Sequence, residues 1–199
     1  MKKTMMAAAA IVVLAGGMAQ AQTMNPLDYP QPEDGSAVWA FIEIPAGSIT
    51  KYETDAKTGL IVVDRYMAMP VVYPANYGSI TQSKNVDGDP LDILVLSREP
   101  IVPGALIKTR VIGTLKMIDD GAQDDKIVAV PASDVDPTYD GIQTIADLPA
   151  ADAQRLKAFF QVYKIKPDGS NKMVVQDFGD IAAAQAMLDE SLKMAKTSN

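Results

Sequence analysis

The stretch "VDGDPLDILVL", residues 86–96, places three carboxylates directly before a run of aliphatic residues: Asp87, Asp89 and Asp92. Gly88 permits a tight bend, and Pro90 fixes its own φ without offering an N–H, so this loop is expected to be stiff. The aliphatic run that follows is typical of a buried β-strand. The stretch therefore predicts a core strand whose entrance carries a dense negative charge.

This negative charge has two interpretations. Three carboxylates this close repel one another, and one of them should hold a proton unless a divalent cation neutralises the group. Alternatively, the stretch is an Asp-rich turn whose side chains accept hydrogen bonds from local backbone N–H groups. The stretch alone does not decide between them. An EF-hand fits poorly, because Leu91 would stand at position 5 of the loop and no glutamate stands at position 12.

Further strands are expected around this one. In residues 36–44, Val38, Ala40, Ile42 and Ile44 alternate with residues of the opposite face, which is the period of a β-strand. Similar apolar runs predict strands at 59–64, 70–74, 91–96, 105–115 and 126–130. Turn-rich segments separate these short strands, a pattern that favours a closed or nearly closed antiparallel barrel.

Helical periodicity comes late in the chain. Within residues 147–164, an apolar face with the spacing i, i+3, i+4, i+7 is formed by Leu156, Phe159, Phe160 and Tyr163. A second helix is expected at about 181–196, with Asp180 as its N-cap. The predicted fold class is therefore α+β and mainly β: a small barrel with two flanking α-helices.

The N-terminal residues have the three-part design of a secretory signal peptide. Lys2 and Lys3 precede an apolar run, and "AQA" ends at Ala21, so cleavage is expected before Gln22. The apolar run is shorter than the roughly 20 residues of a membrane span. We therefore expect residues 1–21 to be removed, residues 22–199 to form a single domain, and the mature protein to be periplasmic or secreted, without a membrane partner.

The composition narrows the classes of partner. Without Lys2 and Lys3, 16 basic residues stand against 25 acidic ones, a formal net charge of −9, which argues against nucleic acid as a partner. The chain has no cysteine and no histidine, so the thiolate and imidazole ligands that zinc and copper favour are absent. Oxygen-only sites for Mg²⁺, Mn²⁺ or Ca²⁺ remain open.

A second acidic loop changes the balance between the two interpretations. "KMIDDGAQDDK", residues 116–126, brings further carboxylates to a strand end. Basic and phenolic residues stand beside acids in "KYE" at 51–53, "DRY" at 64–66, "YPANYG" at 73–78 and "YK" at 163–164. Lysine, arginine and tyrosine side chains bind phosphate oxygens, and divalent cations bridge the same oxygens. This combination points to phosphoryl transfer.

Several spaced motifs resemble those of a known family. "VDGDPLD" at 86–92 matches the metal-binding signature of the family I soluble inorganic pyrophosphatases, bacterial type. Four more segments, at 42–53, 63–78, 111–130 and 159–164, resemble segments of that family in the right order. The resemblance implies a Mg²⁺-dependent hydrolysis of pyrophosphate to two phosphates by a metal-activated water, without a covalent intermediate.

The resemblance also implies a role for individual residues. Asp89 resembles the general base, and the metal ligands, including an acid that reaches the metals through water, would be Asp87, Asp92, Asp119, Asp124 and Glu43. The phosphates would be held by Lys51, Arg65, Tyr77, Tyr163 and Lys164. Supporting positions would be Glu53, Tyr73 and Lys126. The family fold is a five-stranded OB-type barrel, several Mg²⁺ ions occupy each site with Mn²⁺ as a substitute, and bacterial members are homo-oligomers, commonly hexamers.

Two other functions are compatible with parts of the sequence. An exported, non-catalytic barrel could bind a divalent metal or phosphate with only some of these residues. A metal-dependent phosphoesterase could act on nucleotides or nucleic acid, although a net charge of −9 disfavours long polyanions. Hydrolysis of pyrophosphate, without hydrolysis of nucleotides or nucleic acid, would favour the pyrophosphatase expectation over both of these alternatives.

Overall fold

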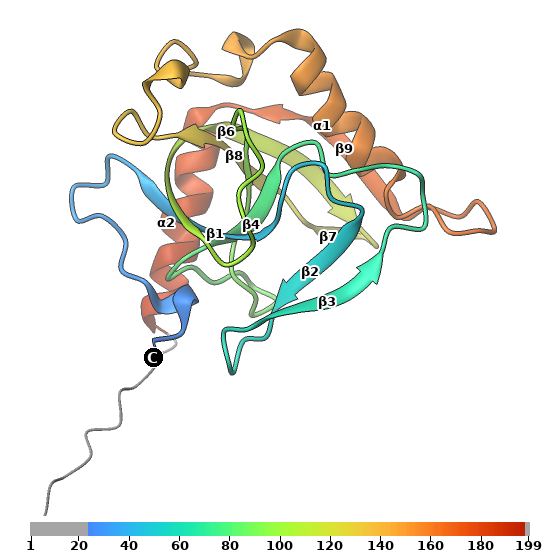
Figure 1. Ribbon diagram of the computed structural model, residues 1–199, viewed down its shortest axis with the longest axis horizontal. Coiled ribbons are helices and arrows are strands. Elements are labelled where there is room, and N and C mark those ends of the chain that lie inside the picture. Colours follow the sequence, from blue (N-terminus) through green and yellow to red (C-terminus); the bar gives the residue numbers. More distant parts are fainter. Residues whose placement is uncertain (1–23, 198–199) are drawn as a thin grey trace, which may run out of the picture.

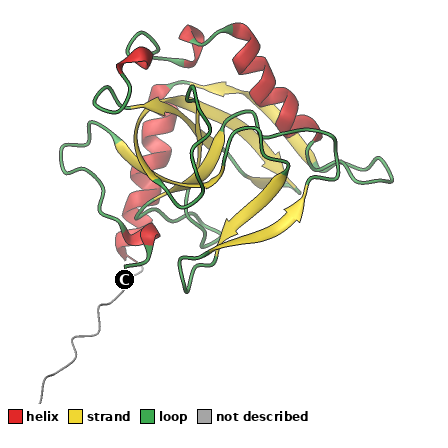
Figure 2. Cartoon of the chain, in the orientation of Figure 1, coloured by secondary structure: helices red, strands yellow, loops and turns green. Residues whose placement is uncertain are grey.

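The computed structural model describes residues 24–197 and is mainly β with two α-helices (Figures 1 and 2). The predicted signal peptide lies outside the described residues. The elements follow in the order η1 (Pro26–Asp28), β1 (Val38–Ile44), β2 (Thr50–Thr54), β3 (Ile61–Tyr66), β4 (Asn76–Ile80), β5 (Asp92–Val95), β6 (Leu106–Asp119), β7 (Ala122–Gln123), β8 (Lys126–Pro131), η2 (Pro137–Tyr139), η3 (Ile145–Asp147), α1 (Ala150–Val162), β9 (Met173–Gly179) and α2 (Ile181–Thr197).

Most strands belong to one sheet. Neighbouring strands pair in the order β1, β4, β5, β8, β6 and β7, while β9 also pairs with β6, and β6 makes an additional pairing with β1. The pair β5–β8 is parallel, whereas the other pairs are antiparallel, so the expectation of an antiparallel sheet is wrong for this pair. The chain leaves β5, runs along the long strand β6 and returns through β7, which brings β8 beside β5 in the same direction.

The predicted strands at 36–44, 59–64, 91–96, 105–115 and 126–130 correspond to β1, β3, β5, β6 and β8. The strand predicted at 70–74 is absent, and this expectation is wrong. Pro70 and Pro74 have no N–H to donate to a ladder, and the neighbouring strand β4 begins only at Asn76. The sequence reading missed β2, β4, β7 and β9.

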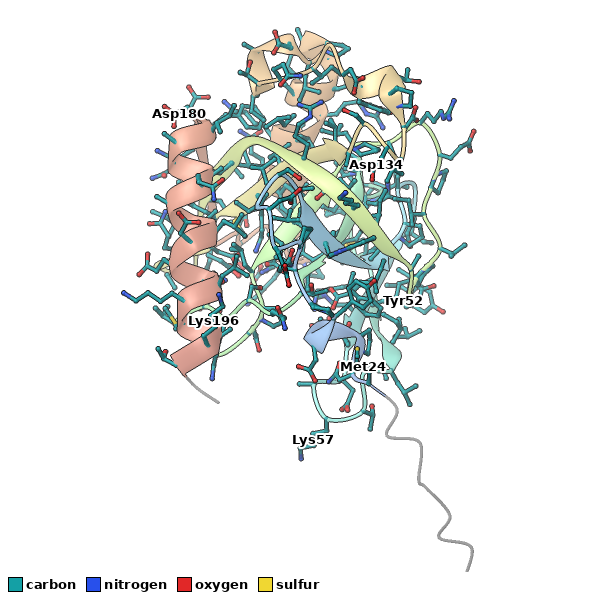
Figure 3. The ribbon with its side chains drawn as sticks, turned by 90° about the vertical axis from the view of Figure 1, so that its left-hand side faces the viewer. Met24, Tyr52, Lys57, Asp134, Asp180 and Lys196 are labelled. Atoms are coloured by element: carbon teal, nitrogen blue, oxygen red, sulfur yellow. The ribbon has the colours of Figure 1, made fainter. Side chains whose placement is uncertain are left out.

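Both predicted helices are present and cover the sheet. Leu156, Phe159 and Phe160 of α1 are buried in one apolar cluster, together with Tyr163 at the C-cap. The helix α2 lies along another side of the sheet, where Ala184 and Leu188 contact a second apolar cluster (Figures 1 and 3). The Asp180 carboxylate accepts a hydrogen bond from the Ala183 N–H over 2.8 Å, as expected of an N-cap.

Two strands approach unusually closely at Gly78 in β4. A Cβ at this position would lie 2.0 Å from the Phe41 carbonyl oxygen of β1, so only glycine fits. This contact keeps Tyr77 and Ser79 close to the end of β1. Within residues 24–197, no helix has both the length and the apolar character required to cross a membrane.

Candidate active site

One pocket of about 420 Å³ collects residues from distant parts of the chain. It lies among the ends of β1, β2, β4, β5, β6 and β8, the loop that precedes β5, and the end of α1. Its lining includes three lysines, three tyrosines and seven carboxylates: Lys51, Lys126, Lys164, Tyr52, Tyr77, Tyr163, Glu43, Glu53, Asp87, Asp89, Asp92, Asp119 and Asp124. The structure therefore brings the two acidic loops together, and places phenolic and ammonium groups beside them.

The loop before β5 has the stiffness that its sequence predicts. The Asn85 N–H donates to the Asp89 carbonyl oxygen over 2.7 Å, and the Gly88 N–H donates to the Asn85 carbonyl oxygen over 3.0 Å. Gly88 has a φ of 96°, a conformation that favours glycine. The Asp87 carboxylate accepts from the Asp89 N–H at 3.0 Å. The turn interpretation is thus confirmed for Asp87, and all three carboxylates line the pocket, where the cation interpretation stays a prediction.

Lys126 is the most buried cation of the pocket, with 3% of its side chain exposed. Its ammonium group donates to the carboxylates of Asp92, at the start of β5, and of Asp124, at 2.5 Å. Burial lowers the pKa of Lys126, but the two carboxylates raise it by more, so the net pKa lies above its ordinary value. Lys126 therefore stays charged and holds the two acidic loops together.

The end of α1 supplies a second ammonium group and a phenol. Lys164 donates to the Asp119 carboxylate at the end of β6. Tyr163 stacks on Phe159 with 5.0 Å between ring centroids, which fixes its ring at the pocket wall. Burial raises the pKa of both Tyr77 and Tyr163. The phenols therefore keep their protons and can donate hydrogen bonds to an anion.

Glu43 is the penultimate residue of β1, lines the pocket and is almost completely buried. The Thr54 hydroxyl, from β2, donates to its carboxylate over 2.5 Å, and the Ser79 hydroxyl, from β4, lies at 3.4 Å. Burial raises the pKa of Glu43 to about 7, although the hydrogen bond from Thr54 acts in the opposite direction. Glu43 is thus an acid held between two hydroxyl groups.

The strands β2 and β3 form a separate hairpin over the pocket. Lys51 donates to Glu53 and, over 2.9 Å, to the Asp64 carboxylate, which also pairs with Arg65 at 2.5 Å. Lys51 and Glu53 line the pocket, but Arg65 is outside its lining and half of its side chain is exposed. Tyr73 is likewise outside the lining: it is buried in the core and stacks against Phe159.

The charge balance of the pocket fits hard cations. Burial and the neighbouring carboxylates of Asp87 and Asp92 raise the pKa of Asp89, and burial also raises that of Asp124. Seven carboxylates face three ammonium groups in this pocket, so part of the negative charge is uncompensated. All the candidate metal ligands are oxygen atoms, which hard cations prefer. Among residues 24–197, no three carboxylates are gathered in a ready-made metal-ligand group. Lys126 lies between Asp92 and Asp124, and Lys164 pairs with Asp119.

The sequence reading missed several pocket residues. Leu27, Thr54, Ser79 and Asn85 also line the pocket. They are small, polar or aliphatic residues without a charged motif, and they reach the pocket through contacts between distant segments. Only the position of Thr54 directly after "KYE" could have suggested a role, since it continues the same strand.

A pocket of this kind, rich in carboxylates and bordered by ammonium and phenol groups, defines a protein that handles phosphate oxyanions with divalent cations. The family profile "Inorganic pyrophosphatase" matches residues 40–196. An inorganic pyrophosphatase of Campylobacter jejuni is 50% identical over 158 residues, which cover 79% of this chain and 91% of that protein. The chain therefore belongs to the inorganic pyrophosphatase family, and the predicted hydrolase class and hydrolysis of pyrophosphate are confirmed.

Solved structures agree with this assignment. The inorganic pyrophosphatase of Thermus thermophilus is similar with a TM-score of 0.81 at 35% identity, covering 87% of this chain and 99% of that one. The enzyme of Helicobacter pylori is similar with a TM-score of 0.79 at 33% identity, covering 84% and 98%. Members of the family depend on metal ions, so the predicted metal requirement holds at this level.

Proposed function

We propose that the protein hydrolyses pyrophosphate by direct attack of water on one phosphorus, with Asp89 as the general base and Mg²⁺ as the cofactor. The observation that carries this proposal is the convergence of seven carboxylates, three lysines and three tyrosines in one pocket. Pyrophosphate is a polyanion that such an acidic pocket would repel unless cations enter first or with it. The basic and phenolic groups then fix the geometry of the bound substrate.

The residues that would hold several Mg²⁺ ions, or Mn²⁺ as a substitute, are Asp87, Asp92, Asp119, Asp124 and, through water, Glu43. Divalent cations, when bound, neutralise phosphate oxygens and lower the pKa of water. The contacts of Lys126 support this assignment for Asp92 and Asp124, because both carboxylates already face one positive charge, its ammonium group.

Asp89 would take the proton of the attacking water. Its pKa is raised by burial and by Asp87 and Asp92, which makes its carboxylate a stronger base than an exposed aspartate. Attack by water places the new P–O bond on one phosphate and leaves the bridging oxygen on the other. No covalent enzyme intermediate is required, which agrees with a chain that has neither cysteine nor histidine.

The two phosphates would be held by Lys51, Arg65, Tyr77, Tyr163 and Lys164. The position of Lys51, Tyr77, Tyr163 and Lys164 at the pocket wall supports these roles. Arg65 would have to exchange its ion pair with Asp64 for a substrate phosphate. Glu53 would orient Lys51, Tyr73 would support the rings of Tyr77 and Phe159, and Lys126 would keep the acidic loops together.

Three further proposals concern the molecule as a whole. Export, with residues 1–21 removed, is supported by the signal-like N-terminal sequence. A five-stranded barrel of the OB type is supported by pairings that run from β1 through β4, β5, β8 and β6 back to β1. Homo-oligomerisation, with a hexamer as the expected form, is supported by the exposed apolar side chains of the hairpin: Leu60, Val62, Val63 and Tyr66.

A comparison of substrates tests the proposed function. The purified protein is incubated with Mg²⁺ and pyrophosphate, ATP or an aryl phosphate, and the release of phosphate is measured. Release from pyrophosphate that greatly exceeds release from the other two supports the proposal. Similar rates with ATP would identify a broader phosphoesterase. Binding of phosphate without turnover of any substrate would identify a non-catalytic binding protein.

A further inference from the structure

The segment of residues 24–31, here called the N-terminal strap, lies along one wall of the active-site pocket. The Gln82 N–H donates to the Leu27 carbonyl oxygen over 2.7 Å, and Leu27 itself lines the pocket. The Gln31 amide donates to the Thr81 carbonyl oxygen over 2.8 Å. The strap is thus fastened to the residues that follow β4 and does not merely rest on the surface.

The ring of Tyr29 provides a second attachment of the strap. It meets the Trp39 ring edge to face, with 5.2 Å between the centroids. Trp39 is the single tryptophan of the chain and belongs to β1. Its fluorescence therefore reports whether the strap remains attached to the barrel strands.

In the part of the chain that the structure describes, the β2–β3 hairpin keeps its position over the pocket without strand pairing to the large sheet. Its two strands pair only with each other within the described residues, in a sheet separate from the large one. At its base, the Tyr73 N–H donates to the Ser48 carbonyl oxygen over 3.0 Å. At its tip, the Asp55 carboxylate accepts from the Thr58 N–H over 2.8 Å and makes the turn rigid. Asp55 directly follows β2, so the hydrogen-bonded turn at the tip continues this strand.

Asn25 of the strap binds this tip. Its amide nitrogen donates to the Ala56 carbonyl oxygen over 3.0 Å, and its amide oxygen accepts from the Leu27 N–H over 3.1 Å. Close packing accompanies these hydrogen bonds, because a Cβ at Gly59 would lie 2.6 Å from Pro26 Cδ. Figure 3 shows Met24, at the start of the strap, near the tip that carries Lys57.

We propose that Asn25 is a positioning residue: it holds the β2–β3 hairpin in the position in which Lys51 contacts the substrate phosphates. Leu27 and Ala56, on the two sides of this link, both line the pocket, so the strap and the tip form a continuous wall. Release of the tip lets β2 tilt away and weakens the contact of Lys51 with substrate and transition state alike. This inference rests on the proposed role of Lys51 and concerns the known hydrolysis of pyrophosphate.

The substitution Asn25→Ser isolates the link. Serine is also a good N-cap for η1, so the acceptor for Leu27 is retained, but its short side chain cannot reach the Ala56 carbonyl oxygen, and the charge does not change. We expect KM for pyrophosphate to rise about threefold to tenfold, the effect of one lost hydrogen bond, while kcat stays within about a factor of two. Asn25→Ala, which loses both hydrogen bonds, should raise KM at least as much.

Asp136→Ala serves as the matched control for a lost cap. Asp136 caps η2 in the same way that Asn25 caps η1: each helix has three residues and begins with proline, and the side chain of each cap accepts from the N–H two residues further on. Asp136 is not part of the pocket lining. This variant should lower the thermal midpoint and leave KM unchanged.

Two glycine substitutions test the same contact between the strap and the tip of the hairpin. Gly59→Ala places a methyl group against Pro26 and pushes the tip away from the strap. Gly35→Ala carries the same kind of backbone strain, because φ is 63° at Gly35 and 69° at Gly59, but a Cβ there meets nothing within 4 Å. We expect KM to rise in Gly59→Ala only.

Hydrogen exchange of the metal-free protein provides a readout that does not depend on activity. In Asn25→Ser, the amides of Thr58 and Gly59 should exchange faster, while Trp39 fluorescence stays as in the wild type because Gln31 and Tyr29 still hold the strap. An unchanged KM in Asn25→Ser would overturn the proposal. So would a KM that rises equally in Asp136→Ala and Gly35→Ala, since the effect would then follow stability alone.

Discussion

Lys126 and Asp124 form an ion pair with 2.5 Å between Nζ and Oδ1 in a pocket where carboxylates outnumber lysines. Only 3% of the Lys126 side chain is exposed, and its ammonium group also contacts Asp92. The start of β8 is thereby tied to the start of β5. A positive charge of the protein itself thus occupies the place where the two acidic loops meet, and this arrangement has consequences for stability.

Removal of the positive charge of Lys126 should lower the unfolding free energy of the protein. In Lys126→Met, Asp92 and Asp124 face each other without a partner, so we expect the metal-free protein to lose about 3–5 kcal/mol of unfolding free energy. Because a divalent cation can replace the lost charge, Mg²⁺ should restore part of this loss. Denaturant unfolding with and without Mg²⁺ measures both effects.

Lys172→Met is the control for Lys126→Met. Lys172 also pairs with an aspartate, Asp120, but both side chains are largely exposed. Exposed pairs contribute little, so no measurable change is expected. Equal stability of Lys126→Met and wild type would show that the buried ion pair does not hold the loops together.

Asp89→Asn should affect turnover more than metal binding. The amide cannot accept the proton of the attacking water, so we expect kcat to fall by a factor of about 10² or more. Binding of Mg²⁺, followed by calorimetry, should remain largely intact. The matched control is Asp125→Asn, which removes a charge from the other acidic loop but keeps an acceptor for the Met117 N–H. Normal turnover in Asp89→Asn would remove Asp89 from the mechanism.

The buried carboxyl of Glu43 should make stability depend on pH. Burial raises its pKa from the ordinary value of 4.5 to about 7 in the metal-free protein. Below pH 4.5 both the folded and the unfolded chain hold this proton. Between pH 4.5 and 7 the unfolded chain releases it first, so the unfolding free energy falls as pH rises, by about 3 kcal/mol in total.

Glu43→Gln removes this titration. The unfolding free energy of the metal-free variant, relative to that of the wild type, should therefore rise between pH 4.5 and 7 and stay constant above pH 7. Urea unfolding at pH 4.5, 6 and 8 measures the difference. An identical pH dependence of the two proteins would mean that the pKa of Glu43 is the same in the folded and in the unfolded chain.

Thr54→Val should move the same titration upward. The Thr54 hydroxyl donates to the Glu43 carboxylate and lowers its pKa, while valine has the same shape and no donor. Loss of this donor therefore favours the protonated carboxyl. The fall of stability with pH should extend above pH 7 in this variant, and infrared titration of the carboxyl band provides an independent measure. A titration that shifts downward would contradict the arrangement.

Local patterns in the sequence were sufficient for part of this fold. The spacing of Leu156 and Phe160 identifies α1, and Asp180 marks the start of α2, because helices are specified by contacts between neighbours in the sequence. The strand β2 carries Lys51 and Glu53 and is mostly half-exposed, so it has no clear alternation of apolar residues. The segment around Pro70 shows the opposite error: it is apolar, but the prolines at its two ends cannot donate an N–H to a neighbouring strand.

The site was predictable where charge marked it. The clusters around Asp89 and Asp124 stand out in the sequence, and the fold brings them to one pocket. Leu27 and Ser79 could not be recognised, because their places in the pocket depend on how β1, β4 and the strap meet. The parallel pairing of β5 with β8 depends in the same way on the path of the chain through β6.

The dependence of activity on a divalent cation tests the central claim most directly. The protein is stripped with a chelator, and the release of phosphate from pyrophosphate is followed while Mg²⁺ is added back. We predict no release from the stripped protein and a rapid release that saturates with Mg²⁺. Release that is equally fast without any divalent cation, or no release with Mg²⁺ or Mn²⁺, would contradict the account.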